Sequence, residues 1–445
     1  MVSPDFIIAH ENDDLAALVL QRDRWPDVDV ALAAECIAAR RKLRLKVPEW
    51  YADPALTCPV ALSAEQCSST ATAAHKAALA AVWNVRRSKP SARGKGPGCV
   101  PQGEPSPGIA PPQACERSIP PRIADLTGGL GVDSWQFSRV AAAVLYNEMN
   151  PVLLEAAKAN LERLGCDNVE FSNILISPET LPGLLDSFQP DLVFIDPARR
   201  FEGRKVFLPE DCSPDVLALQ DIILERGCRL MLKLSPMADI SLLLRKFHCI
   251  KELHVVEADG ECKELLLVQE PGFEGDPEIK IAVATGEKAR VTNIEYSSLI
   301  SAKPLFIQDI PAPGQILFEP GPALMKSGSI NFLSKFFGLP KLGPSTHILC
   351  FGDNGYMDEK TFRTIDGFGK WFIIQEVAKF SKSTVKDFAT RWPDAEVTAR
   401  ALPLSSDELR KKLGVKGGGD VHVFGVGTSQ GRLLIAASKA TLDLH

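Results

Sequence analysis

The chain has 445 residues, of which 45% are hydrophobic and 24% charged, a composition typical of folded globular proteins and unlike that of disordered chains. At roughly 100–200 residues per domain, this length predicts two to four domains. The net charge of −6 excludes a uniformly basic nucleic-acid coat, although it leaves room for a basic face on one domain.

Residues 1–87 are predicted to form a helical N-terminal region, because stretches such as VDVALAAECIAARRKLRLK place apolar residues at helical spacing. Ser63, followed three positions later by Gln66, has the pattern of a capping box that opens a further helix. The basic cluster at 40–46 is predicted to be a solvated helix face, with contact to nucleic acid as the alternative.

Residues 88–118 are rich in Pro, Gly and Ser and lack apolar periodicity, which predicts a flexible insertion. In residues 119–270, short apolar runs then alternate with helical segments, a pattern that predicts a parallel sheet covered by helices on both faces. The predicted strands of this sheet span 123–126, 144–148, 169–172, 192–196 and 230–234.

Two further apolar runs, at 253–257 and 264–268, are joined by a short turn and are predicted to form an antiparallel pair that closes the edge of the sheet. Residues 271–368 and 369–445 are predicted to be small α+β domains. Helices at 383–391 and 406–413 carry a basic stretch, which on charge alone predicts solvated helix faces, with contact to nucleic-acid phosphates as the alternative.

The protein is expected to be cytoplasmic, with reduced thiols. Its eleven cysteines form no C-x-x-C pair, so that neither a metal site nor a disulfide framework is indicated. The acidic start MVSPDFIIAHENDD differs from secretory and transit peptides. No apolar stretch approaches the roughly 20 residues that cross a bilayer, so we expect no membrane contact.

The string IADLTGGLGVDSW places Gly128, Gly129 and Gly131 between a predicted strand that ends near Asp125 and a helix that begins near Asp133. Glycine permits a tight turn and lets a ligand approach the backbone closely. The first turn of a helix also offers unpaired N–H groups to a polar ligand. The string therefore predicts a cofactor-binding turn.

Glu148 ends the next predicted strand, where a carboxylate accepts hydrogen bonds from ribose hydroxyls. Two details favour a methionine-like ligand over a dinucleotide. Ser134 stands where the dinucleotide motif has its third glycine, and Asp125 would repel a pyrophosphate but suits an amino group.

A later strand ends in Asp196-Pro197-Ala198-Arg199, at the carboxyl edge where such sheets bind ligands. The proline ring fixes φ and can turn a neighbouring carbonyl outward. Asp196 beside that carbonyl gives two acceptors, which can hold the hydrogens of an amine and direct its lone pair at an electrophilic methyl group. The alternative for Asp196 is a structural cap at the strand end.

Basic residues lie near the end of the strand that contains Asp196. Arg199 and Arg200 follow it directly and are suited to gripping an acidic group of the substrate. Lys233, at the end of the following strand, is predicted to border the same pocket. An ordinary solvated surface is the alternative for all three residues.

On these motifs, the chain resembles class I S-adenosylmethionine-dependent methyltransferases, and more narrowly the family of THUMP-like methyltransferases, whose members carry similar DLTGGLGVD and DPAR strings. The resemblance covers nearly the whole chain outside 88–118. Further similar stretches are AEQCSSTATAAHKA at 64–77, LKLSPMADI at 232–240, HVVEADGECKELL at 254–266, FEPGPALMKSG at 318–328 and LPLSSDELRKKLGVKGGGDVHVFG at 402–425.

The resemblance implies an α/β architecture with a helical N-terminal region at 1–87 and a Rossmann-like methyltransferase domain at 119–270. A small ferredoxin-like domain at 271–368 and a THUMP-like domain at 369–445 would follow. It also implies S-adenosylmethionine as cofactor and a nucleobase of structured RNA, tRNA or rRNA, as substrate. Two alternatives are a methyltransferase for a protein side chain or small metabolite, and a non-catalytic RNA-binding protein with a degenerate fold.

The predicted site residues follow from the same motifs. The cofactor-binding residues are Asp125, Thr127, Gly128, Gly129, Gly131, Asp133, Glu148 and Asn173. The catalytic residues are Asp196, Pro197 and Arg199, and the substrate-binding residues are Arg200 and Lys233. The sequence departs from many relatives in two ways: Asn173 stands near the place of an acid that contacts adenine, and D-P-A-R lacks the aromatic ring of D-P-P-Y, which stacks on a flipped base.

Overall fold

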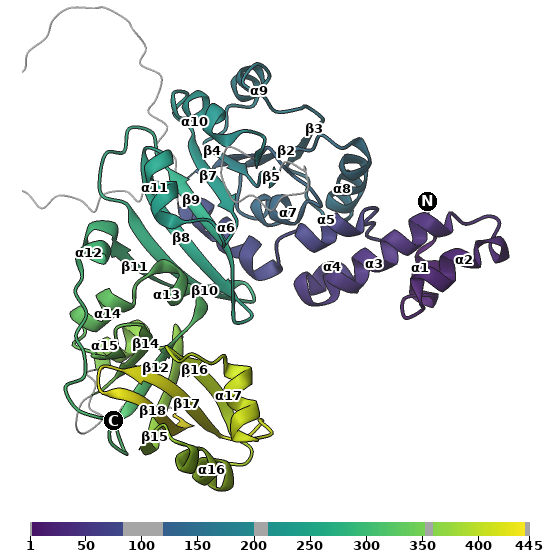
Figure 1. Cartoon of the computed structure of the whole chain (residues 1–445). Coiled ribbons are helices and arrows are strands. Elements are labelled where there is room, and N and C mark those ends of the chain that lie inside the picture. The colour runs from purple at the N-terminus through teal and green to yellow at the C-terminus, as the bar shows by residue number, and fades with distance from the viewer. Residues whose placement is uncertain (1, 83–118, 200–211, 352–358, 441–445) are drawn as a thin grey trace, which may run out of the picture. The chain divides into compact units, whose positions relative to one another are not determined.

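The structure is a computed structural model that describes residues 2–82, 119–199, 212–351 and 359–440. The predicted insertion at 88–118 and Arg200 lie outside these residues, and only the backbone of Arg199 is described. The chain divides into two compact units; Figure 1 labels helices and strands of both. The first comprises Met1–Ile195 and Arg226–Arg229; the second comprises Asp196–Glu225 and Leu230–His445.

Short helices form the N-terminal part of the first unit. They are α1 (Pro4–Ala9), α2 (Leu15–Leu20), the 3-10 helix η1 (Arg22–Arg24), α3 (Val30–Lys46), α4 (Pro48–Ala52), α5 (Ala61–Gln66) and α6 (Thr70–Val82). The predicted capping box is wrong, because Ser63 lies inside α5. The amide of Ala61, the first residue of α5, donates instead to the Glu35 carboxylate at 3.0 Å, an acceptor that only the fold brings there.

The basic cluster at 40–46 lies on a largely exposed face of α3, as predicted, with Arg41, Lys42 and Arg44 exposed, and two of its side chains also bond to neighbouring segments. Arg41 Nε donates to the Glu11 carbonyl oxygen at 2.6 Å. Lys46 Nζ donates to the Cys67 carbonyl oxygen at 2.9 Å. These bonds tie α3 to the loop after α1 and to the end of α5, so that the two side chains stabilise the packing of the helical region.

The first unit also contains a parallel sheet with the order β4-β1-β2-β3. Its strands are β1 (Arg122–Asp125), β2 (Ala143–Asn147), β3 (Val169–Ser172) and β4 (Leu192–Ile195), and the helices between them are α7 (Val132–Ser138), α8 (Pro151–Arg163) and α9 (Leu181–Phe188). The predicted alternation of strands and helices is confirmed. Because parallel strands end at the same edge, the residues that follow β1 and β2 lie side by side.

The second unit begins with a small ribbon and a mixed sheet. The ribbon pairs β5 (Ala198–Arg199) with β6 (Cys212–Ser213). The sheet has the order β11-β10-β8-β9-β7, made of β7 (Arg229–Leu234), β8 (Ile250–Ala258), β9 (Glu261–Gln269), β10 (Glu278–Thr285) and β11 (Lys288–Glu295). Its helices are α10 (Val216–Leu224), α11 (Ile240–Lys246) and α12 (Tyr296–Ser301).

The antiparallel pairing predicted for 253–257 and 264–268 is present as β8 and β9. The pair does not close the edge of the sheet, because β10 pairs in parallel with β8 and β11 continues beyond it. Buried Ile279 and Ile281 on β10 explain the extension, since they give this strand an apolar face to cover.

A second sheet of the same unit has the order β13-β14-β12-β15-β18-β17-β16. Its strands are β12 (Ile316–Pro320), β13 (Lys341–Gly343), β14 (Thr346–Cys350), β15 (Gly369–Lys379), β16 (Glu396–Arg400), β17 (Val421–Thr428) and β18 (Gly431–Lys439). The helices are α13 (Pro322–Ser327), α14 (Ile330–Phe336), α15 (Glu359–Ile365), α16 (Lys382–Arg391) and α17 (Ser406–Leu413).

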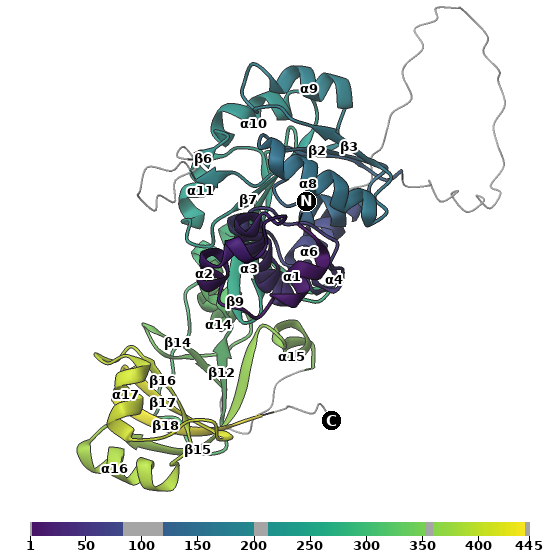
Figure 2. The ribbon, with the colours of Figure 1, turned by 90° about the vertical axis from the view of Figure 1, so that its right-hand side faces the viewer.

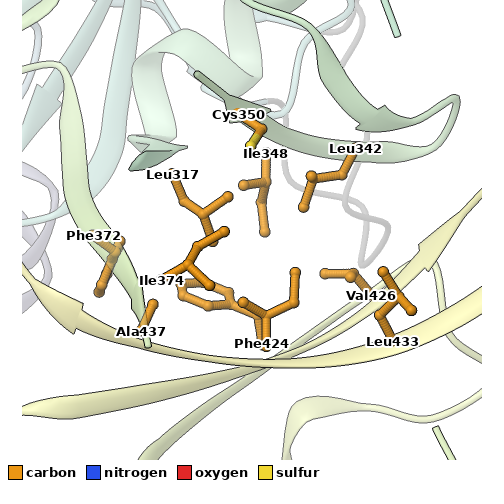
Figure 3. Close-up of a cluster of buried hydrophobic side chains, with 11 residues drawn as sticks. Leu317, Leu342, Ile348, Cys350, Phe372, Ile374, Phe424, Val426, Leu433 and Ala437 are labelled. Atoms are coloured by element: carbon orange, nitrogen blue, oxygen red, sulfur yellow. The ribbon is translucent and has the colours of Figure 1, made fainter. Parts of the chain in front are cut away.

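Each face of this second sheet carries its own core. Phe388 of α16 and Leu409 of α17 pack on one face, beside which both helices lie (Figure 2). Side chains from β12 to β18, among them Leu317, Ile348 and Phe424, form the other core (Figure 3). Antiparallel pairing of β12 with β15 joins the segments predicted as ferredoxin-like and THUMP-like into one sheet.

Candidate cofactor and substrate sites

The turn between β1 and α7 requires glycine at three positions. Gly128 N donates to the Asn147 carbonyl oxygen at 2.8 Å, and a Cβ at Gly128 would overlap the ring of Tyr146. Gly129 has φ +56° and Gly131 has φ +94°, a region that favours glycine. The three glycines therefore shape a turn that lies directly against β2.

Glu148, which follows β2, is clamped to this turn. Its Oε2 accepts a hydrogen bond from Gly129 N at 2.9 Å, and its Oε1 accepts one from Asn150 N at 2.8 Å. Asn173 Nδ2 donates to the Glu148 carbonyl oxygen at 2.6 Å. The fold thus brings three of the predicted cofactor residues together. Each carboxylate oxygen can accept a further hydrogen bond, such as one from a ribose hydroxyl.

Asp125 lies directly before the turn and is buried, with only 1% of the residue exposed. Its Oδ1 accepts a hydrogen bond from Thr127 N at 3.2 Å, and its Oδ2 accepts one from Ser134 Oγ at 2.6 Å. Direct binding of Asp125 to an amino group stays a prediction. The two hydrogen bonds show that the Asp125 carboxylate stabilises the conformation of the turn.

Asp133, also predicted to bind the cofactor, is bonded toward the N-terminal helices. Its Oδ2 accepts a hydrogen bond from Ser68 Oγ at 2.7 Å, and its Oδ1 lies 3.0 Å from Lys76 Nζ. Sequence reasoning missed Lys76, because a single lysine in an Ala-rich helix resembles a surface residue. The only signal for it was the string AEQCSSTATAAHKA, which was noted for the family resemblance alone.

Asn147 is a second residue that sequence reasoning missed. Its Nδ2 donates to the carbonyl oxygens of Leu126 at 3.1 Å and Ile174 at 3.0 Å, while its Oδ1 accepts from Ile174 N at 2.9 Å. These bonds join the chain after β1 to the chain after β3. A buried asparagine that ends an apolar strand must have such partners, which is the signal that could have identified it.

In the second unit, Asp196 is paired with Lys233. The Lys233 Nζ lies 2.6 Å from Asp196 Oδ2, with 14% and 34% of the two side chains exposed. Asp196 directly follows β4 in the chain, and Pro197 separates it from β5. The structure therefore brings together two of the predicted substrate-site residues, while the Arg199 side chain and Arg200 lie outside the described residues.

Other site types find little support in the described part of the chain. Within residues 2–82, 119–199, 212–351 and 359–440, no three His, Cys, Asp or Glu side chains are grouped as metal ligands. No described helix has the length and apolarity needed to cross a membrane. Burial raises the pKa of Cys262 to about 11 and that of Cys58 to about 12, which disfavours thiolate chemistry at both.

The predicted basic stretch lies on helices α16 and α17, which contact each other on one face of the second sheet. Lys412 Nζ lies 5.4 Å from the centre of the Phe380 ring, and Arg391 pairs with Glu376 at 2.7 Å. The two helices that carry these charges therefore pack on the same face of the sheet. Further exposed lysines on or beside these helices are Lys382, Lys386, Lys411 and Lys416.

Two known families match the C-terminal part of the chain. A THUMP domain-like family matches residues 369–439, and a ferredoxin-like domain matches residues 317–350. The predicted ferredoxin-like and THUMP-like domains are thereby confirmed, whereas the boundaries drawn at 271 and 369 stay predictions.

Similar proteins extend the comparison to the rest of the chain. The crystal structure of a proposed methyltransferase from Porphyromonas gingivalis W83 is 26% identical, with a TM-score of 0.78, and the match covers 98% of this chain and 97% of that one. An uncharacterized S-adenosylmethionine-dependent methyltransferase of Mycobacterium tuberculosis H37Rv is 23% identical over 297 residues, 66% of this chain and 74% of the relative. The resemblance to THUMP-like methyltransferases is confirmed, and so is the enzyme class.

Proposed function

We propose that this chain transfers a methyl group from S-adenosylmethionine to a nucleobase of structured RNA, either tRNA or rRNA. The relative from M. tuberculosis supports the cofactor, and the THUMP domain-like match supports an RNA substrate by analogy. One observation carries the proposal. The glycine turn and Glu148 are bonded together where parallel strands end, which is where such sheets bind nucleotide-like ligands.

The turn offers the donors and acceptors that S-adenosylmethionine needs. Glu148, held by Gly129 N, would accept the ribose hydroxyls. The backbone from Thr127 to Gly131 would contact the methionine end, with Asp125 fixing the shape of the turn. Bound there, the cofactor supplies an electrophilic methyl group on a sulfonium.

Asp196 and Lys233 would orient the nucleophile of the substrate for methyl transfer. The Lys233 ammonium holds one carboxylate oxygen and so fixes the orientation of Asp196. The hydrogens of an amine nucleophile would be accepted by Asp196 and by the Pro197 carbonyl, which directs the nitrogen lone pair at the methyl carbon. On transfer of the methyl group the nitrogen would give up a proton, and the Asp196 carboxylate that accepts its hydrogen bond would take it. Arg199 and Arg200 would bind an RNA phosphate.

The proposal is tested with the full chain, S-adenosylmethionine tritiated on its methyl group, and total RNA. We expect label in the RNA bases, with transfer about 100-fold slower or more in Asp196→Asn and in Lys233→Met because the nucleophile is no longer oriented. Isothermal titration should give both variants the cofactor affinity of the wild type. Absence of cofactor binding by the wild type contradicts the cofactor assignment, and label confined to protein or small molecules contradicts the RNA assignment.

The basic surface of α16 and α17 is tested separately. Replacing Lys386 and Lys411 by Glu should weaken RNA binding and reduce the slope of log affinity against log salt, by roughly one for each phosphate that the protein no longer neutralises. Lys288→Glu, at the exposed first residue of β11, makes the same charge change as each of the two substitutions and serves as control. Equal binding by both variants would contradict an RNA contact at this surface.

A further inference from the structure

A charged cluster is buried beside the glycine turn. No part of the Lys76 side chain on α6 is exposed to solvent. Its Nζ lies 3.0 Å from Asp133 Oδ1 and donates to Ser68 Oγ at 2.8 Å, and Ser68 Oγ donates in turn to Asp133 Oδ2 at 2.7 Å. The ammonium also lies 5.7 Å from the centre of the Phe194 ring on β4.

Packing alone does not account for a lysine at this position. Removing an ammonium from water is costly, and ion pairing in the interior often does no more than offset that cost. A methionine of similar length would fill the same volume between α6 and α7 without desolvating a charge. Beside Lys76, α6 buries the alanines Ala73, Ala77 and Ala80 together with the uncharged polar side chains of Thr70 and Thr72 and with His75.

Asp133, the partner of Lys76, lies next to the residues that shape the cofactor turn. Asp133 is the second residue of α7 and follows the Gly131 cap by two positions. Its neighbour Ser134 holds the Asp125 carboxylate, and the same turn presents Gly129 N to Glu148. A shift of Asp133 would therefore move the first residues of α7 and the backbone that Glu148 is bonded to.

We propose that Lys76 is a positioning residue for the cofactor turn. Through this lysine on α6, the N-terminal helical region would contribute to cofactor binding. The inference rests on the proposed function. Lys76 acts through Asp133 and does not touch the cofactor. The ion pair holds the start of α7, and with it the turn, in the conformation that binds S-adenosylmethionine.

The test measures S-adenosylmethionine binding by titration calorimetry on full chains carrying Lys76→Met, Asp133→Asn or both substitutions. We expect Lys76→Met to raise the Kd by roughly tenfold or more, because Asp133 is left buried without its cation. The double variant should bind no more weakly than Lys76→Met alone, since both changes disable one pair. Asp133→Asn preserves the size and shape of the side chain while removing its charge. It therefore tests the same ion pair if Lys76→Met does not fold.

The control is Arg163→Met, which removes an exposed ion pair with Asp53 that also joins the N-terminal helices to the sheet domain. It should leave the Kd unchanged. A wild-type Kd for Lys76→Met, together with a lower unfolding midpoint, would overturn the positioning role and leave Lys76 a purely structural residue.

Failure of the proposed function is recognised independently, because the wild type itself would then not bind S-adenosylmethionine. In that case amide hydrogen exchange tests whether Lys76 holds the turn in place. Faster exchange at residues 129–133 in Lys76→Met than in the wild type supports it, and equal exchange rules it out.

Discussion

Single positions decide whether the cofactor turn can form at all. Gly128 packs its backbone against the Tyr146 ring, so a methyl group there must displace either the ring or the turn. Gly183 in α9 offers the opposite case, because a Cβ there would meet no atom within 4 Å. The two glycines therefore allow the same substitution to be compared in a crowded and in an open environment.

We predict that Gly128→Ala lowers the free energy of unfolding by about 1–3 kcal/mol through overpacking, and that it abolishes S-adenosylmethionine binding. Gly183→Ala should raise the free energy of unfolding by about 0.5–1 kcal/mol, because alanine favours the helix. Urea unfolding measures both values. Destabilisation of similar size in the two variants would contradict the crowding argument.

A partly buried histidine makes the second unit sensitive to acid. Burial lowers the pKa of His422 to about 4, with Lys370 and Lys439 acting in the same direction and Glu396 opposing them. Because this lies below the ordinary value of 6.5, the unfolded chain takes up the proton first as the pH falls. The stabilisation is present above pH 6.5 and is lost on the way down to about pH 4, on the order of 3 kcal/mol in full.

His422→Gln should remove this part of the pH dependence while keeping a hydrogen-bond partner for Thr398, whose Oγ1 lies 2.6 Å from His422 Nε2. We expect the urea midpoint to fall less between pH 7 and pH 5 in the variant than in the wild type. Burial also lowers the pKa of His254 and His347, so the variant should retain some acid sensitivity. Identical pH profiles would show that His422 does not contribute.

At the scale of elements, short helices depend on the sheet beneath them. Helix α13 has six residues, too few to be stable alone. Glu257 of β8 accepts a hydrogen bond from Ala323 N at 2.9 Å, and Lys326 Nζ donates to the Ala238 carbonyl oxygen at 2.7 Å. Both ends of α13 are thus bonded to neighbouring parts of the chain, which fixes the helix on β8 to β10.

Glu257→Ala should cost about 1–3 kcal/mol of unfolding free energy, because the buried amide of Ala323 loses its acceptor. Glu257→Gln retains a carbonyl oxygen at the same place and should cost clearly less. Thermal and urea unfolding of the two variants provide the comparison. Equal losses would indicate that charge, and not the hydrogen bond to α13, is what Glu257 contributes.

At the scale of the whole molecule, the THUMP-like segment is not a detachable module. Strand β15 pairs with β12 over five registered positions, and both strands contribute to the core in Figure 3. Removing residues 369–445 would expose the edge of β12 and one half of that core. Charge substitutions on α16 and α17 are therefore a better test of RNA binding than deletion.

We predict that a chain ending at residue 368 aggregates or loses fixed tertiary packing, because an exposed apolar strand edge favours association. Size-exclusion chromatography and near-ultraviolet circular dichroism would detect either outcome. A truncated chain that elutes as a single folded species would contradict the interdependence of the two segments.

Local patterns were sufficient to predict much of the chain. The alternation of strands and helices, the glycine turn and the helices of the last segment follow from periodicity, glycine requirements and helix starts, which act over a few residues. The family resemblance added the THUMP-like and ferredoxin-like domains. Glu148 was placed at the turn because parallel strands end together, a rule that needs only strand order.

Tertiary structure decided everything that depends on partners distant in sequence. Glu35 replaces the expected cap at Ser63, and β10 and β11 extend the sheet beyond the pair that was expected to close its edge. Lys76 meets Asp133, although nothing near either residue specifies its partner, and Lys233, expected only to border the pocket of Asp196, forms an ion pair with it. The sequence by itself determined which segments form and which residue types end them. Only folding determined which buried charges face each other, because that pairing is set by long-range packing and not by local spacing.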